Sequence, residues 1–148
     1  PGTVKVVLVD EEKRSPSQSI IDAVTDYIES QRPVGANVTV VGVTEVSIDI
    51  SADLTLQDGV SIDDVKTEIT NNLTSYFKTV AFADDSVDTV AANDGVVRYS
   101  QIANAIYDAT GVIDYENLKV NGGTANIVLG DEEVPVVGAV LVTQVQNQ

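Results

Sequence analysis

The stretch RPVGANVTVVGVTEVSIDISADLTL, residues Arg32–Leu56, carries the signals that decide the fold. Pro33 ends a preceding helix, because a residue before proline avoids the α region. Residues 36–41 (ANVTVV) are typical of a strand, and Gly42 predicts a tight reversal after it. From Val46 to Leu56 apolar and polar residues alternate, which predicts a strand with one buried face and one wet face.

Asp49 and Asp53 fall on the wet face of this alternating strand. Aspartate is a poor strand former and is tolerated where its side chain meets water. One interpretation is that the two carboxylates keep the sheet soluble and prevent sheet-on-sheet association. The other is that Asp49 and Asp53 face a basic partner.

Arg32 raises the question of whether the start of the stretch binds an anion. An anion site needs converging donors, but Arg32 lies between Gln31 and Pro33, with no glycine-rich cradle. An arginine at a helix C-terminus complements the helix dipole, and Gly35 allows the chain to turn into the next strand. We therefore interpret Arg32, Pro33, Gly35 and Ala36 as a structural joint.

Upstream of the joint, residues 4–9 predict a strand, followed by a helix. Ser15 is placed as its N-cap, Pro16 as its first residue and Gln18 as the partner in a capping box. Apolar residues recur at helical spacing and predict a buried face: Ile20, Ile21, Val24, Tyr27 and Ile28.

Downstream, Ser61 caps a second helix that runs to about Lys78. Its predicted buried stripe consists of Val65, Ile69, Leu73 and either Tyr76 or Phe77. A third helix over residues 100–111 turns Ile102, Ala105 and Ile106 inward and ends at Gly111.

The C-terminal part is β-rich. NGG at 121–123 predicts a hairpin built on Gly122 and Gly123. Residues 134–142 (VPVVGAVLV) are apolar on both faces, which predicts a central or covered strand. Pro135 belongs at the beginning of this strand or on a sheet edge.

Between these parts, residues 83–95 are acidic and turn-rich, and predict a long loop or short hairpin. Loose calcium binding is a minor alternative there, by Asp84, Asp85, Asp88 and Asp94, because the spacing departs from that of a calcium loop.

Composition excludes several classes of function. The chain has 148 residues, a net charge of −15 and only eight basic residues, which are scattered. Binding to nucleic acid or an anionic membrane surface needs clustered Lys and Arg, and no apolar run reaches the roughly 18 residues of a membrane span. Without His or Cys, a Ser–His triad and thiolate metal sites are excluded, whereas a Ser–Lys dyad stays formally open. With Pro first and no Met, we expect a piece of a longer protein.

The order of several blocks resembles the baseplate J-like proteins of contractile-tailed phages and tailocins. SPSQSIIDAVTDYIESQRPVGANVTV (15–40) is similar to a family signature, and three later blocks follow in the family's order: YFKTVAF (76–82), VVRYSQIANAIYDATGVIDYENLKVNGGTANI (96–127) and VPVVGAV (134–140). Residues 83–95 depart from the pattern, because the connection there looks longer than usual.

This resemblance implies a structural wedge component of the tail baseplate, present in several copies around a hub. It implies no catalysis and no cofactor, and it implies partners among other baseplate proteins and further copies of the parent protein. From the residues themselves we also expect no metal site. The anchors of such a component would be apolar groups in TVAF (79–82) and in residues 134–142. The alternative is an acidic binding or carbohydrate-active domain using exposed carboxylates, although the chain has no Trp and only five Tyr to form sugar platforms.

The fold class that we predict is α+β, with mixed sheets and helices on one face. Residues 1–43 form a small lobe and 44–148 a larger one, closely packed, with a single domain as the alternative. The smaller lobe should pack on the remainder or join its sheet, because two strands and a helix are marginal alone. A ferredoxin-like arrangement is the specific alternative.

Overall fold

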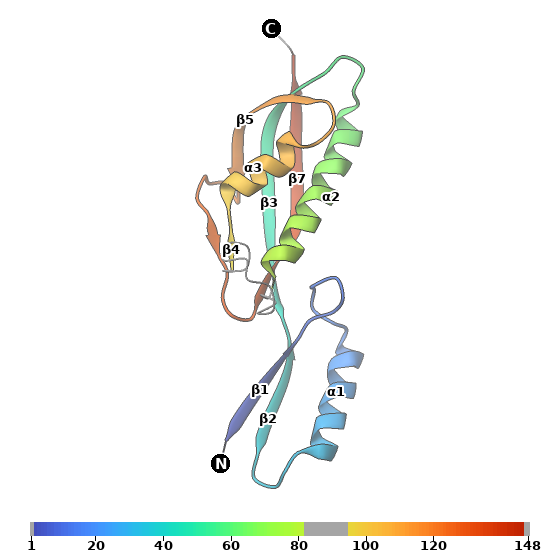
Figure 1. The fold of residues 1–148 in the computed structure, drawn as a ribbon, viewed down its shortest axis with the longest axis vertical. Helices are drawn as coiled ribbons and strands as arrows, with labels where there is room; N and C mark the ends of the chain where they lie inside the picture. The colour runs from blue at the N-terminus through green and yellow to red at the C-terminus, as the bar shows by residue number, and fades with distance from the viewer. Residues whose placement is uncertain (1, 82–94, 147–148) are drawn as a thin grey trace.

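A computed structural model describes residues 2–81 and 95–146, which form two lobes stacked along the long axis of the molecule (Figure 1). The elements follow in the order β1 (Thr3–Leu8), α1 (Gln18–Gln31), β2 (Asn37–Gly42), β3 (Thr44–Leu56), α2 (Ile62–Val80), β4 (Val96–Val97), α3 (Tyr99–Tyr107), β5 (Val112–Val120), β6 (Ile127–Val128) and β7 (Glu133–Val145).

The smaller lobe is a β–α–β unit in which β1 and β2 pair in parallel as a sheet of their own. They therefore do not join the sheet of the larger lobe. The helix α1 packs on β2, and a Cβ added at Gly42 would lie 3.2 Å from the Ile21 side chain and 3.4 Å from Pro16. This face of the small sheet is thus the one that α1 covers.

The predicted start and buried face of α1 were wrong. The helix begins at Gln18 with Ser17 as N-cap, and Ser15 instead donates its backbone N–H to Glu45. No residue of α1 is fully buried, and Ile20 and Tyr27 are 50% and 69% exposed. The physical reason is that a helix over two strands has too little surface beneath it to bury a wide apolar stripe.

The chain does not reverse at Gly42, contrary to the sequence-based expectation. The strand β2 passes through the single residue Val43 into β3 and continues in nearly the same direction (Figure 1). One continuous extended segment therefore belongs first to the small sheet and then to the large one. Since Gly42 lies under Ser15 and Pro16, its lack of a side chain serves close packing rather than a turn.

The larger lobe is built on a three-stranded sheet of order β5-β3-β7. The central strand β3 pairs antiparallel with β5 and parallel with β7. The alternation predicted for β3 is confirmed, since one set of alternate residues is buried: Ile48, Ile50, Ala52, Leu54 and Leu56. The apolar β7 is an edge strand, and α2 packs against it.

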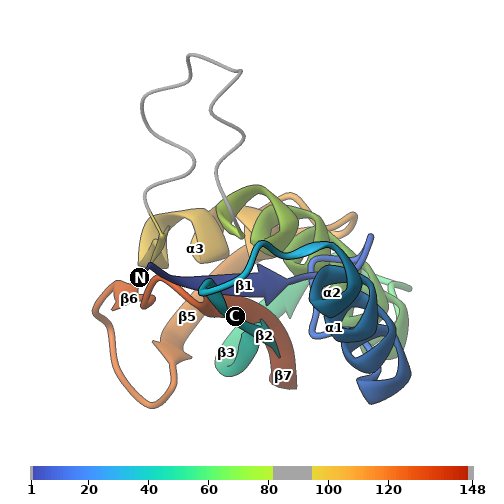
Figure 2. The ribbon, with the colours of Figure 1, turned by 90° about the horizontal axis from the view of Figure 1, so that it is seen from below.

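The helices α2 and α3 lie on the same side of this sheet (Figure 2) and close its core. The buried stripe of α2 agrees with the prediction, with Phe77 rather than Tyr76 fully buried: Val65, Ile69, Leu73, Phe77 and Val80. The inward residues predicted for α3 are also buried, together with Ala103. Ser61 is the N-cap of α2, although its hydroxyl makes no capping hydrogen bond to described residues.

The fold class is therefore α+β, as predicted, with mixed sheets. The ferredoxin-like alternative is not adopted, because β1 and β2 form a separate sheet. The predicted loop at 83–95 and its four candidate calcium ligands lie outside the described residues, apart from Gly95.

Candidate functional site: the junction between the lobes

The junction is centred on Val43, where the strand passes from one sheet to the other. The Val43 N–H donates to the Leu8 carbonyl of the smaller lobe at 2.9 Å. The next N–H, of Thr44, donates to the Glu132 carbonyl of the larger lobe at 2.8 Å. Consecutive backbone groups are thus bound to different lobes, which fixes the strand at the crossing point.

A small apolar cluster surrounds this crossing point. Val43, Ala81 and Val134 are 4%, 2% and 0% exposed, and Val7 and Val9 pack against them. The cluster joins β1, the end of α2 and the start of β7. It is separate from the main core of the larger lobe, so the contact between the lobes has its own hydrophobic centre.

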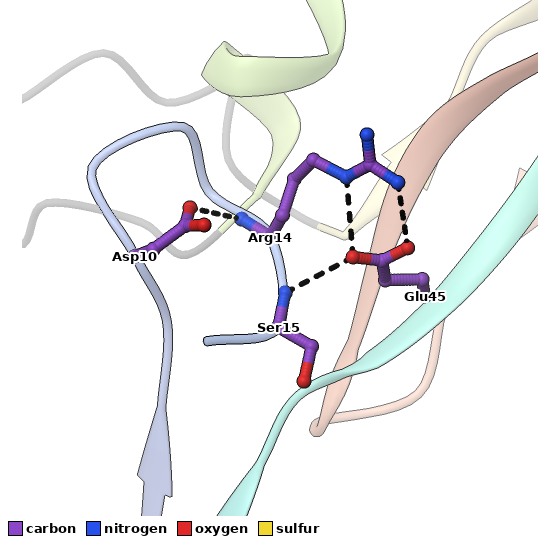
Figure 3. Close-up of polar contacts among 4 residues, drawn as sticks. All are labelled: Asp10, Arg14, Ser15 and Glu45. Carbon is purple, nitrogen blue, oxygen red and sulfur yellow. Dashed lines mark hydrogen bonds and ion pairs between the residues drawn. The ribbon is translucent and has the colours of Figure 1, made fainter. Parts of the chain in front are cut away.

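A bidentate ion pair between Arg14 and Glu45 also joins the two lobes (Figure 3). The Arg14 Nε and Nη2 donate to the two Glu45 oxygens at 3.1 and 2.9 Å, and the Ser15 N–H donates to Glu45 at 3.1 Å. The hydrogen bond from Arg14 holds the pKa of the Glu45 carboxyl below its ordinary value; partial burial opposes this and the Ser15 N–H adds to it. The geometry is the planar fork that arginine forms with carboxylates.

Two further ion pairs connect the lobes. Lys5 of β1 pairs with Glu132 at 2.6 Å, and Lys78 of α2 pairs with Glu12. Lys5, Arg14 and Lys78 are three of only eight basic residues in the chain, so an unusual share of its cations lies at this junction. Each pair joins the smaller lobe to the larger one, which indicates that the junction is held as one polar and apolar unit.

The Arg14–Glu45 pair should make the stability of the junction depend on pH and salt. A lowered pKa in the folded state contributes stability above the ordinary Glu value of about 4.3, and that stability is lost as pH falls through the lower, folded value. We expect a double-mutant cycle of Arg14→Gln and Glu45→Gln to give a coupling of about 0.5–1 kcal/mol at pH 7 and none near pH 2. Urea unfolding measures it.

The same cycle at higher ionic strength should give a smaller coupling, because both side chains are partly exposed to solvent. Lys66→Gln, an exposed change on α2, is the control and should leave the pH profile of unfolding unchanged. A coupling that is constant from pH 7 to pH 2 would contradict an ionic role for Glu45.

The predicted joint residues lie in the turn between α1 and β2, at the end of the smaller lobe far from the junction (Figure 1). Arg32 pairs with Glu29 at 2.7 Å and also donates to the Ala36 carbonyl, and Gly35 has a φ of +93°. The structure thus brings Arg32 and Ala36 together within one local turn. Their importance for assembly stays a prediction.

The predicted hairpin residues lie in a tight turn after β5. Asn121 and Gly122 have φ values of +48° and +77°, and Val120 exchanges both backbone hydrogen bonds with Gly123. The following strand β6, however, pairs with β4 rather than with β5. The turn therefore redirects the chain toward β4 and α3.

Asp49 and Asp53 lie on the wet face of β3, and both have partners within the chain. The Asp49 carboxylate accepts the Ala139 N–H at 2.9 Å, and a Cβ added at Gly138 would overlap it. Asp53 accepts from the Asn117 side chain at 2.8 Å. The Asp49 side chain thus binds a backbone N–H of β7 where the register of β3 and β7 shifts. Its contact with a partner protein stays a prediction.

A metal site and a membrane-spanning helix each have requirements that the described residues do not meet. Within residues 2–81 and 95–146, no three carboxylates lie close enough together to hold a metal ion. Among the helices described, none combines the length and apolar character needed to cross a membrane. The residues at the junction carry hydrogen bonds and ion pairs whose geometry fixes two lobes relative to each other.

These features define a two-lobed α+β chain whose lobes are joined by ion pairs and an apolar cluster, and comparison with known proteins identifies its family. The baseplate J-like central domain matches residues 1–42, and the baseplate J-like protein C-terminal domain matches residues 48–143. The chain belongs to the baseplate J-like protein family. Residues 43–47, between the two matches, lie where β2 passes into β3. Whether the lobes fold separately stays a prediction.

Two relatives from Bacillus subtilis (strain 168) are similar over nearly the whole chain. The phage-like element PBSX protein XkdT is 37% identical over 150 residues, covering 97% of this chain and 40% of that protein. The uncharacterized protein YqbT is 36% identical over 146 residues, covering 94% of this chain and 39% of that protein. The chain thus spans about two fifths of the length of these relatives.

Proposed function

We propose that this chain is a structural module of a baseplate wedge in a contractile phage tail or tailocin. It acts through protein–protein contacts in assembly and carries no catalytic step. Membership of the baseplate J-like family, with matches over both lobes, is the observation that carries the proposal. Similarity to a protein of a phage-like element supports the same context.

The junction gives this proposal a physical basis. A wedge component has to hold its neighbours at defined angles, and two loosely tethered lobes could not do so. The bidentate Arg14–Glu45 pair, the other two ion pairs and the Val43 cluster together resist a change in the angle between the lobes. The partners are other baseplate proteins and further copies of the same protein, in the tail baseplate assembled in the host cytoplasm.

No observation favours the carbohydrate-active alternative at the predicted residues. Asp49 and Asp53 lie on an open sheet face, with their carboxylates hydrogen-bonded to groups of the same chain. Neither carboxylate lines the cavity between the 10–15 loop, α2 and β7, or the polar cavity between α2 and α3.

Gene deletion with complementation tests the proposed function. We expect a phage or tailocin producer without the gene that encodes this chain to yield no complete baseplates in electron micrographs, and the wild-type gene to restore them. An epitope tag on the protein, detected with gold-labelled antibody, should mark the tail end that carries the baseplate. Normal contractile particles in the deletion strain, or a label at the opposite end, would rule the function out.

A matched pair of variants tests whether assembly depends on the Arg14–Glu45 pair. Arg14→Glu should reduce complementation, and the swap Arg14→Glu with Glu45→Arg should restore part of it, because the ion pair is re-formed with reversed polarity. If Arg14→Glu alone complements as well as the wild type, assembly does not require the Arg14–Glu45 ion pair.

A further inference from the structure

A cavity lies at the junction, between the loop 10–15 of the smaller lobe, one flank of α2 and the start of β7. Its volume is about 250 Å³, and Phe77, Pro135 and Val137 supply apolar lining. Sites for drug-sized molecules usually have roughly 300–1,000 Å³. This cavity is smaller, and its size suits one apolar side chain of a polypeptide.

Charge around the cavity is opposite to that of the chain. Its lining includes three basic residues, Lys13, Arg14 and Lys78, and one acidic residue, Glu12, whereas the chain as a whole has a net charge of −15. Arg14 and Lys78 already have carboxylate partners. The Lys13 ammonium has no carboxylate partner among the described residues, so it is the cation available to a ligand.

The loop that carries Lys13 is held in a defined shape. Asp10 accepts the N–H groups of Glu12 and Arg14 at 2.9 Å each, and the Lys13 N–H donates to the Asp10 carbonyl at 3.0 Å. Lys13 has a φ of +61°, which is uncommon for a residue other than glycine and costs free energy. The surrounding hydrogen bonds keep Lys13 in this conformation beside the cavity.

We infer that this cavity binds an acidic segment of a different baseplate protein that neighbours this chain in the assembled tail. A carboxylate of the segment pairs with Lys13, and an adjacent apolar side chain packs against the half-buried Val137. The inference deepens the proposed function by naming the chemistry of one partner. A segment bound there touches both lobes and therefore stabilises their relative orientation.

Binding of short peptides to the isolated chain tests this inference without any tail assembly. The probe is Ac-Asp-Glu-Leu-Glu-NH₂, compared with Ac-Gln-Gln-Leu-Gln-NH₂ and Ac-Lys-Lys-Leu-Lys-NH₂, at about 0.15 M salt and followed by amide chemical shifts in NMR. We expect the acidic peptide to shift the amides of Lys13, Thr74 and Gly138. The neutral peptide should bind about tenfold more weakly, because it lacks the charge-assisted hydrogen bond.

Lys13→Asn is the decisive variant. Asparagine adopts positive φ more readily than lysine, so the loop keeps its shape while the ammonium is removed. Affinity for the acidic peptide should fall about tenfold, and the control Lys66→Asn on α2 should leave it unchanged. Equal binding of acidic and neutral peptides, or no effect of Lys13→Asn, would overturn the inference. Protein-concentration-dependent self-association in sedimentation that Lys13→Asn abolishes would overturn it too, since the occupant would be a second copy.

Discussion

Leu54→Ala should lower the free energy of unfolding by about 2–5 kcal/mol, a large fraction of the roughly 5–15 kcal/mol that holds a typical domain folded. Leu54 is 0% exposed near the C-terminal end of β3, with Tyr115 of β5 and Gln144 of β7 as its register partners. Truncation removes apolar contacts and leaves a cavity that the surrounding sheet and helices cannot fill.

The sheet offers a matched control for this substitution. Leu141 lies on β7, the strand next to β3, but it is 63% exposed on the open face. Leu141→Ala should therefore cost less than about 1 kcal/mol. Urea unfolding of both variants, with unchanged slopes, measures the difference. Equal losses would mean that the assignment of buried and open faces is incorrect.

The parts of the fold that follow from local patterns were predictable from the sequence. The alternation from Val46 to Leu56 placed five side chains correctly on the buried face of β3. The helical spacing of Val65, Ile69 and Leu73 likewise identified the face of α2 that is buried. In both cases residues that recur at the period of the element share one face, and that apolar face is the one that the fold buries.

The smaller lobe shows where a periodic pattern is insufficient. The spacing in α1 is correct for a helix, but the pattern cannot state how much surface lies beneath it. Ile21 and Ile28 are half-buried over β2, whereas Ile20 and Tyr27, on the flank of the same apolar stripe, remain largely exposed. Amphipathic spacing therefore predicted the helix but overestimated its burial.

The junction was not predictable, for two physical reasons. Glycine before a β-branched run is compatible with both a turn and a close packing contact, so Gly42 suggested a reversal that does not occur. The ion pairs join residues that are far apart in sequence, such as Arg14 with Glu45 and Lys78 with Glu12. The one available signal was the scarcity of basic residues, which makes the position of each cation informative.

The substitution Val134→Asp should uncouple the two lobes. Val134 is 0% exposed in the apolar cluster with Val43 and Ala81, and an unpaired carboxylate there costs several kcal/mol because it loses its water. The main core of the larger lobe does not include Val134. We therefore expect the larger lobe to stay folded, while the smaller lobe, which has no fully buried side chain in β1, α1 or β2, unfolds first.

Hydrogen exchange measures this outcome lobe by lobe. In Val134→Asp the amides of β1 and β2 should exchange at least about a hundredfold faster than in the wild type, corresponding to roughly 3 kcal/mol, and those of β3 should change much less beyond the junction. Val128→Asp, at a side chain that is 77% exposed, is the matched control and should change neither set. Uniformly faster exchange in both lobes would instead show a single cooperative unit. A two-stranded sheet has only marginal stability by itself. If exchange rises selectively in β1 and β2, the Val43 cluster therefore determines both the angle between the lobes and whether the smaller lobe is folded.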